Sequence, residues 1–248
     1  MRNIWTIAKR EYDHYFITPI AYIVAFFILV VLGLYFFFVL FYFSQNNIQL
    51  YGQSPDFGII AGVFSFLMVF AIPMLTMRLI ADETRMGTIE LLLTSPIRDF
   101  ELVTGKWLGS FLFMLTLILT TIIYPLILNN LIDPGLDWGL VGSTYLALIL
   151  VAASLLSLGV GISALFSNQI AVLISSLFVG IILWWVVGVP ANLFAPPVSD
   201  FFQFLHMNAH VDALIGGEIG LDSISYFLSL IALGLFTATT AVEMRRWR

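Results

Sequence analysis

Two histidines show a spacing that suits metal chemistry. His206 and His210 stand four residues apart, and Asp212 follows closely. A helix would place both imidazoles on one face, where they could share a metal ion. The zinc-peptidase pattern fails, because Met207 stands where that pattern has its catalytic Glu. We therefore expect ordinary interfacial histidines and keep His206 and His210 only as weak metal candidates.

Motifs for hydrolytic chemistry are incomplete in this chain. Ser163 lies in "GISA", which is faintly similar to a nucleophile turn, but the three histidines fall outside the apolar segments and leave this serine without a general base. The stretch "FELVTGKW" has Phe100 and Trp107 where a phosphate-binding loop requires Gly and Ser or Thr. Cysteine is absent, which excludes disulfides and Cys-based metal sites. We expect no enzyme activity and no cofactor in this chain, so any transport energy must come from another subunit.

The charges of the chain are concentrated in residues 78–106, "RLIADETRMGTIELLLTSPIRDFELVTGK". The chain has ten basic and 15 acidic residues, and nine of these lie in this segment. Gly87 can end one helix, and Thr88 can cap a new short helix that Pro96 stops. Leucines on one face of this short helix cost free energy unless a partner receives them. The pattern favours a rigid knob that binds a partner, and a plain solvated turn is the alternative. The residues assigned to this site are Glu83, Arg85, Gly87, Thr88, Ile89, Glu90, Leu92, Leu93 and Pro96.

Composition shows what must surround these residues. Hydrophobic residues make up 60% of the chain and charged residues 10%, with a mean hydropathy of +1.02. A soluble domain uses about 25% charged residues, so lipid must be part of the solvent of this chain. Apolar windows of about 20 residues are long enough to span a bilayer. The prediction is a single all-α polytopic transmembrane domain over residues 1–248. Its six spans are expected at about 20–43, 57–80, 103–128, 141–166, 170–190 and 223–243.

Basic residues predict the orientation of the spans. All ten lie before span one, between spans two and three, or after span six, whereas the loops 44–56, 129–140 and 191–222 contain only acidic charges. The positive-inside rule then places both termini and the loop 81–102 in the cytoplasm. The charge-free windows from which the spans are assigned, such as 107–132 and 223–242, contain no Asp, Glu, Lys or His, which argues against an ion-driven carrier. The net charge of −5 argues against a nucleic-acid partner.

Residues 1–18 are predicted to form an amphipathic elbow helix in the membrane interface. Its apolar face would contain Ile4, Trp5, Ala8, Tyr12, Tyr15 and Phe16, and its polar face would contain Arg2, Thr6, Lys9, Arg10, Asp13 and His14. The interfacial site residues are Trp5, Lys9, Arg10, Tyr12 and Phe16. A surface anchor is one interpretation, and an elbow that also touches a cytoplasmic partner is the other.

Two further helix features are expected from the sequence. In the outer loop 191–222, Ser199 could cap one helix, "DFFQFLHMNAHVDALI", that Gly216 and Gly217 end. That helix would lie on the outer leaflet or dip into it. In the fourth span, Ala153, Ser157 and Gly161 stand four residues apart, a pattern typical of close helix packing.

Several motifs resemble one transporter family. The stretch "ADETRMGTIELLLTSP" resembles the signature between spans two and three of ABC-2 type exporter permeases. The stretches "KREYDHYFITPIAYIV", "SNQI" and "YFLSLIALGLFTATTAVEMRRW" are similar to the branch containing the gliding-motility permease subunit and the permease of nitrous-oxide-reductase maturation. These motifs occur in the right order, and the resemblance extends over essentially the whole chain.

The resemblance implies a six-span half-transporter in a bacterial cell membrane. It implies pairing with a second permease subunit, as a homodimer or heterodimer, and with a separate cytoplasmic ATPase that binds ATP and Mg. The loop 81–102 would be the coupling element, with Glu90 facing a basic residue of the ATPase and Leu92 and Leu93 filling its groove. Lipidic, peptide or glycan cargo and a purely mechanical role all stay open. The alternative function is a non-transporting membrane anchor or assembly factor that recruits a cytoplasmic protein.

Overall fold

The computed structural model describes residues 2–45, 56–88, 97–132 and 135–246. Regular structure in these residues is helical throughout, and six helical segments are long and apolar enough to cross a membrane. These segments are Pro19–Gln45, Phe57–Arg85, Asp99–Leu131, Trp138–Leu165, Gln169–Leu193 and Leu221–Arg245. The predicted all-α polytopic membrane fold with six spans is confirmed.

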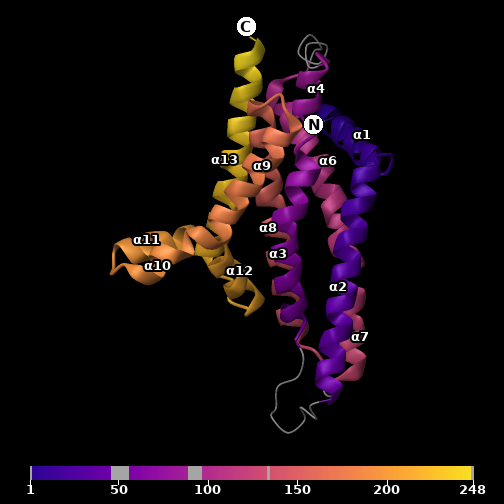
Figure 1. Cartoon of the computed structure of the whole chain (residues 1–248), viewed down its shortest axis with the longest axis vertical. Helices are drawn as coiled ribbons and strands as arrows, with labels where there is room; N and C mark the ends of the chain where they lie inside the picture. The colour runs from indigo at the N-terminus through magenta and orange to yellow at the C-terminus, as the bar shows by residue number, and fades with distance from the viewer. Residues whose placement is uncertain (1, 46–55, 89–96, 133–134, 247–248) are drawn as a thin grey trace.

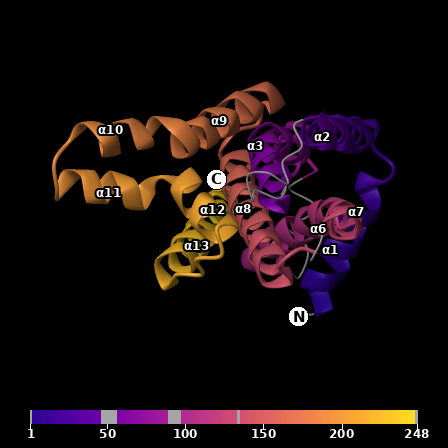
Figure 2. The same cartoon turned by 90° about the horizontal axis from the view of Figure 1, so that it is seen from below.

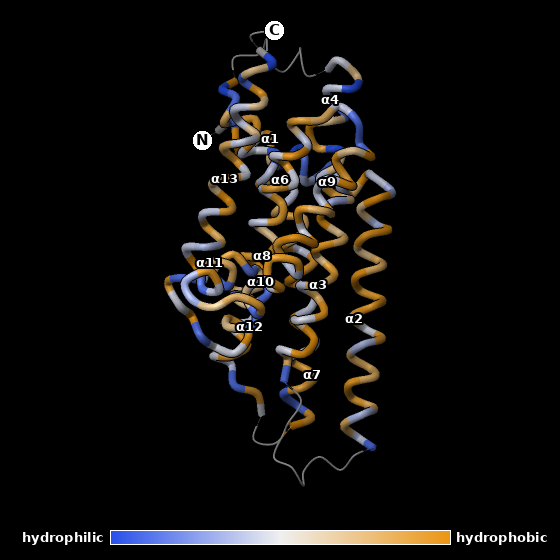
Figure 3. The backbone as a smooth tube through the Cα atoms, turned by 60° about the vertical axis from the view of Figure 1, so that its left-hand side comes forward, coloured by the Kyte–Doolittle hydropathy of each residue, from blue (hydrophilic) through white to orange (hydrophobic). Residues whose placement is uncertain are grey.

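The helices form an elongated bundle (Figure 1). In chain order they are α1 (Arg2–Tyr15), α2 (Pro19–Gln45), α3 (Phe57–Thr76), α4 (Ala81–Arg85), α6 (Asp99–Thr120), α7 (Ile123–Leu131), α8 (Trp138–Leu165), α9 (Gln169–Ile181), the π-helical η2 (Ile182–Val186), α10 (Gly188–Leu193), α11 (Val198–Leu205), α12 (Met207–Ile215) and α13 (Leu221–Arg246). Both termini lie at the end of the bundle that carries α1 and α4, which we call the termini end. Figure 3 shows hydrophobic residues along α2 and α3, with hydrophilic residues gathered toward the ends.

The fourth span, α8, is the central helix of the bundle. In its apolar window 72% of residues are buried, against 28% for α2, which lies at the outside and packs mainly on α3. The backbones of α8 and α13 approach closely. A Cβ added to Gly161 would lie 2.6 Å from Thr237 Oγ1, and Ser157 Oγ donates to the Leu230 carbonyl over 3.3 Å. The predicted packing role of the small residues on this helix is confirmed.

The third span is broken into α6 and α7. Pro125 lacks the N–H that would bond to the carbonyl of Thr121, and its ring crowds that carbonyl, which favours a break one turn before the proline. Residues 121 and 122 instead donate to carbonyls three residues back, Ile118 and Leu119. The break therefore has a local cause, the proline that the sequence places late in this span.

The N-terminal helix α1 is packed against α6. A Cβ added to Gly105 would lie 2.7 Å from Ile7 Cβ, and one added to Gly109 would lie 2.6 Å from Glu11 Cβ. Two glycines four residues apart thus let the backbones of α1 and α6 approach closely. The buried face of α1 consists of Ile7, Ala8, Glu11 and Tyr15. The structure divides the predicted apolar face: Trp5 and Phe16 are 58% and 42% exposed, whereas Ala8 and Tyr15 are buried together with Glu11, which the prediction did not place.

The segment between spans five and six also differs from the prediction. The expected single helix is two helices, α11 and α12, which are separated at His206 by an extended ψ of 102°. Ser199 does not cap the helix but lies within α11 and donates to the Ala191 carbonyl over 2.9 Å. As expected, the helix ends before Gly216, and Gly217 has a left-handed φ of 86°.

Figure 1 shows α10 and α11 projecting sideways part-way along the bundle, and Figure 2 shows them lying side by side. This position is well inside the length covered by α2 and α3. It favours helices that dip into the membrane over helices that lie on its surface.

Candidate functional site

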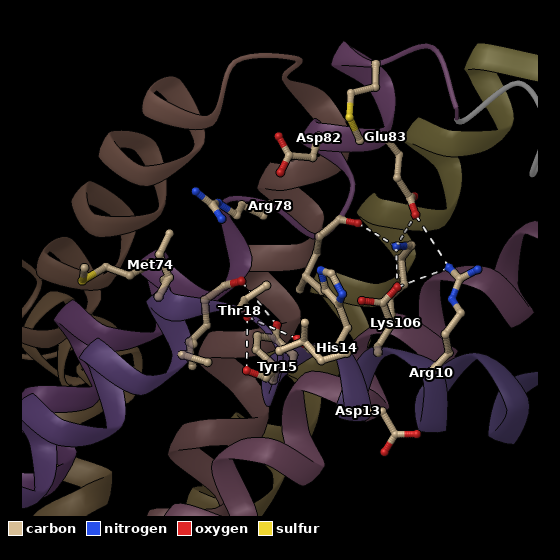
Figure 4. Close-up of a pocket in the computed structure, with 17 residues that line it drawn as sticks. Arg10, Asp13, His14, Tyr15, Thr18, Met74, Arg78, Asp82, Glu83 and Lys106 are labelled. Carbon is tan, nitrogen blue, oxygen red and sulfur yellow. Dashed lines mark hydrogen bonds and ion pairs between the residues drawn. The ribbon is translucent and has the colours of Figure 1, made fainter.

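Two carboxylates of the termini end, Glu11 and Glu83, converge on Lys106, in the first part of α6. Its Nζ donates to Glu11 Oε1 at 2.9 Å, to Glu83 Oε1 at 2.8 Å and to the Leu79 carbonyl at 2.8 Å (Figure 4). An ammonium group has three donors, and all three are used. The cluster joins α1, α6, α4 and the turn before α4, so one buried side chain connects elements from three parts of the sequence.

Burial makes this cluster energetically important. Lys106 is 1% exposed, and the Glu11 and Glu83 side chains are 11% and 17% exposed. Removing one partner from such a buried set leaves an uncompensated charge, which is strongly destabilising. The third helical segment begins at Asp99, so it carries Lys106 just before the charge-free window at 107–132. Through its two carboxylate partners, Lys106 holds α1 and α4 in position against α6 at one end of the bundle.

Arg10 adds a second, weaker positive charge to the cluster. Its Nη2 lies 3.5 Å from Glu11 Oε1 and 3.9 Å from Glu83 Oε1, and its side chain is 61% exposed. Ion pairs this open to water contribute little to stability. Arg10 and Glu83, assigned from the sequence to different sites, are nevertheless brought together at one place.

The short helix α4 is also fastened to the opposite side of the bundle. Ser163, near the end of α8, accepts hydrogen bonds from the backbone N–H groups of Ile80 and Ala81 at 3.1 and 3.2 Å. Gln169, at the start of α9, donates its side-chain amide to Asp82. Ser163 therefore satisfies backbone donors at the start of α4.

Tyr15 ties the end of α1 to the end of α3. Its hydroxyl donates to the Leu75 carbonyl over 3.3 Å, and its ring stacks on Phe113 at 4.8 Å between centroids. Burial raises the pKa of Tyr15 far above its ordinary value, and the nearby Glu11 charge raises it further. The phenol therefore stays protonated and remains a donor.

The segment predicted to bind a partner follows directly after α4. Arg85 is the last residue of α4 and is exposed. Gly87 has a left-handed φ of 72°, which fits the expected end of a helix. The Thr88 hydroxyl donates to the Glu83 carbonyl over 3.3 Å, so this side chain turns back toward α4. Five predicted members of the site lie outside the described residues: Ile89, Glu90, Leu92, Leu93 and Pro96.

The predicted interfacial residues of α1 do not share one environment. Trp5, Lys9 and Phe16 are exposed. Tyr12 is partly buried and its hydroxyl lies 3.2 Å from Thr116 Oγ1 on α6. The helix thus presents aromatic side chains outward and packs its other side on α6.

The two candidate metal ligands are held apart by separate hydrogen bonds. His206 Nε2 lies 2.9 Å from the Trp184 carbonyl. Both ring nitrogens of His210 are engaged, with Ser223 Oγ at 3.0 Å and the Phe204 carbonyl at 2.8 Å. Within the described residues, no group of three or more His, Cys, Asp or Glu side chains could hold a metal ion. The histidines act as connectors between the short helices.

Sequence reasoning missed Glu11, Lys106 and the glycines that bring them together. Lys106 was assigned to the end of a polar loop, and its partner Glu11 stands 95 residues away. One signal was available, because Gly105 and Gly109 show the four-residue spacing of a close helix contact. A lysine beside such a contact is a candidate for burial.

Comparison with known families identifies the family of the chain. A family profile described as ABC-2 family transporter protein matches residues 5–245. The chain belongs to the ABC-2 transporter family. Comparison with curated proteins gives no significant match. The match covers most of α1, the Lys106 cluster and nearly all of α13, so the ABC-2 domain includes most of the N-terminal helix as well as the six spans.

Membership makes this chain the membrane component of an ABC transporter. ABC-2 permeases work with an ATPase subunit. In this ABC-2 protein the contacts of α4 therefore connect the bundle to the part of the chain just before the segment 89–96, where a partner is expected.

Proposed function

We propose that this chain is the permease subunit of an ATP-driven ABC-2 exporter, coupled to its ATPase through the segment 89–96. In this proposal the termini end faces the cytoplasm, as the distribution of basic residues favours. A second permease subunit completes the transporter, and ATP and Mg are bound by the ATPase.

The observation that carries the proposal is the set of contacts made by α4. This helix immediately precedes the segment 89–96, and its buried polar contacts reach α1 and α6 through Lys106, α8 through Ser163 and α9 through Gln169. A push on the segment would therefore be delivered to four helices by short contacts. A solvated turn would not require such an attachment.

The experiment measures permease-dependent ATP hydrolysis in a reconstituted complex. Glu90→Arg and Leu92→Asp should leave insertion and folding intact but remove most of the stimulation of the ATPase by the permease. Glu218→Arg is the matched control, because it makes the same charge change at an exposed residue in the loop before α13.

Two outcomes contradict the proposal. Wild-type stimulation in both variants would show that the segment 89–96 is not the coupling element. An ATPase whose activity never depends on this chain would favour the anchor or assembly role instead.

A further inference from the structure

A cavity of about 480 Å³ lies beside the Lys106 cluster, between the α1–α2 turn and the ends of α3 and α4. Figure 4 shows Arg78 on one side of it and the Lys106 cluster on the other. Two hydrogen bonds join its walls, from Tyr15 to the Leu75 carbonyl and from Lys106 to the Leu79 carbonyl. The cavity is thus preformed, and its size falls in the range of small-ligand sites, roughly 300–1,000 Å³.

Most charges around this cavity are already engaged within the protein. Glu11 and Glu83 are paired with Lys106 and Arg10, and Asp82 accepts from Gln169. Figure 4 shows the carboxylate of Asp13 directed away from Arg78 and Lys106.

Two cationic or potentially cationic side chains remain. Neither Arg78 nor His14 makes a side-chain hydrogen bond or ion pair with any residue in the described part of the chain, although both line the cavity. An arginine and a histidine that line the same cavity can together bind a phosphate group.

The rest of the lining indicates where the phosphate comes from. Ile17, Ile20, Ala21 and Met74 supply an apolar surface next to the charged one. Ile17 is 76% exposed and Met74 is 37% exposed, and they lie at the beginning of span one and the end of span two. A soluble anion has no apolar part that could pack on this surface, whereas a phospholipid presents a phosphate and an acyl chain side by side.

The α1–α2 turn is fixed in a way that suits a binding site. The Tyr22 hydroxyl donates to the Phe16 carbonyl over 2.7 Å, and the Thr18 hydroxyl lies 3.3 Å from the His14 carbonyl and 3.2 Å from that of Tyr15. These bonds hold the backbone on which His14 and Ile17 stand. The wall of the cavity is therefore ordered before a ligand arrives.

We propose that this cavity binds one membrane phospholipid, with its phosphodiester on Arg78 and His14 and its acyl chain along Ile17, Ile20 and Met74. The lipid would fill the space between the elbow helix and the second span. It would thus be a structural ligand of the permease and need not be the exported cargo.

The test uses the full-length permease alone, without an ATPase, reconstituted in phosphatidylethanolamine and phosphatidylglycerol, then purified in detergent and analysed by native mass spectrometry. The wild type should retain one phospholipid per chain. Arg78→Gln should reduce retention about tenfold, since a charge-assisted hydrogen bond is lost. Arg85→Gln is the matched control, because Arg85 is an exposed arginine nearby that does not line the cavity. Equal melting temperatures of the three proteins in detergent would show that folding is unaffected.

A second variant distinguishes a lipid from a free phosphate. Ile17→Asp leaves Arg78 in place but makes the apolar wall polar, so it should also lose the phospholipid. Soluble glycerol phosphate at millimolar concentration should fail to displace the lipid from the wild type. The proposal is overturned if Arg78→Gln retains lipid like the wild type, or if Ile17→Asp has no effect and glycerol phosphate competes. Because no ATPase is present, these outcomes are independent of the coupling proposal.

Discussion

At the scale of single residues, Lys106 is the side chain on which the termini end depends most. It is the only lysine or arginine in the described residues that is buried, and its three donors are shared between two carboxylates and a carbonyl. Lys106→Met should destabilise the protein by about 3–5 kcal/mol, because it leaves Glu11 and Glu83 buried without their cation. In a thermal melt in detergent this corresponds to a midpoint lower by roughly 10 °C.

A combined variant separates charge from shape at the same site. Lys106→Met together with Glu11→Gln and Glu83→Gln removes all the buried charges, and most of the lost stability should return, as in other buried ionic sets replaced together. Lys9→Met is the control, since Lys9 is an exposed lysine on α1. A single Lys106→Met variant that melts like the wild type would show that the cluster does not stabilise the fold.

At the scale of elements, the contact between α1 and α6 depends on glycine. Gly109→Leu should displace α1, because even its Cβ would lie 2.7 Å from the Ala8 carbonyl. The chain has no cysteine, so spin labels can be attached to cysteines introduced at exposed Lys9 and Phe100. The distance distribution between these labels should broaden in Gly109→Leu. Gly62→Leu is the matched control, because no atom lies within 4 Å of its added Cβ, and a distribution unchanged by Gly109→Leu would contradict the assignment.

Prediction from sequence succeeded for the elements whose signal is local. The spans could be found because charge-free windows of sufficient length occur nowhere else, and the role of Gly161 followed from its spacing with Ser157. The break at His206 could not be found, because it depends on contacts with Trp184, 22 residues earlier. The burial of Glu11 could not be predicted either. The sequence of α1 gives an apolar face that does not contain Glu11, and only the packing of α6 against α1 buries this side chain.

At the scale of the whole molecule, the orientation of the bundle is testable with the same cysteine-free background. Met86 is exposed and follows α4, at the end of the second span. Asn130 is exposed and lies near the end of α7, at the end of the third span, so the two residues lie at opposite ends of the bundle. In intact cells an impermeant maleimide should label the Asn130→Cys variant, while the Met86→Cys variant should react only after the membrane is opened. The reverse pattern would overturn the cytoplasmic placement of the termini end. A reporter fused after Arg248 should agree with the Met86 result.

The distance along the chain between Glu11 and Lys106 has a consequence for biosynthesis. Glu11 leaves the ribosome 95 residues before its partner, which is about 5–20 s at ordinary translation speeds. During that interval two hydrophobic spans enter the bilayer while the N-terminal helix must keep its carboxylate in water. The nascent protein can therefore pack α1 against α6 only after Lys106 has been synthesised. A chain arrested before this lysine would expose an undocked N-terminal helix to proteases.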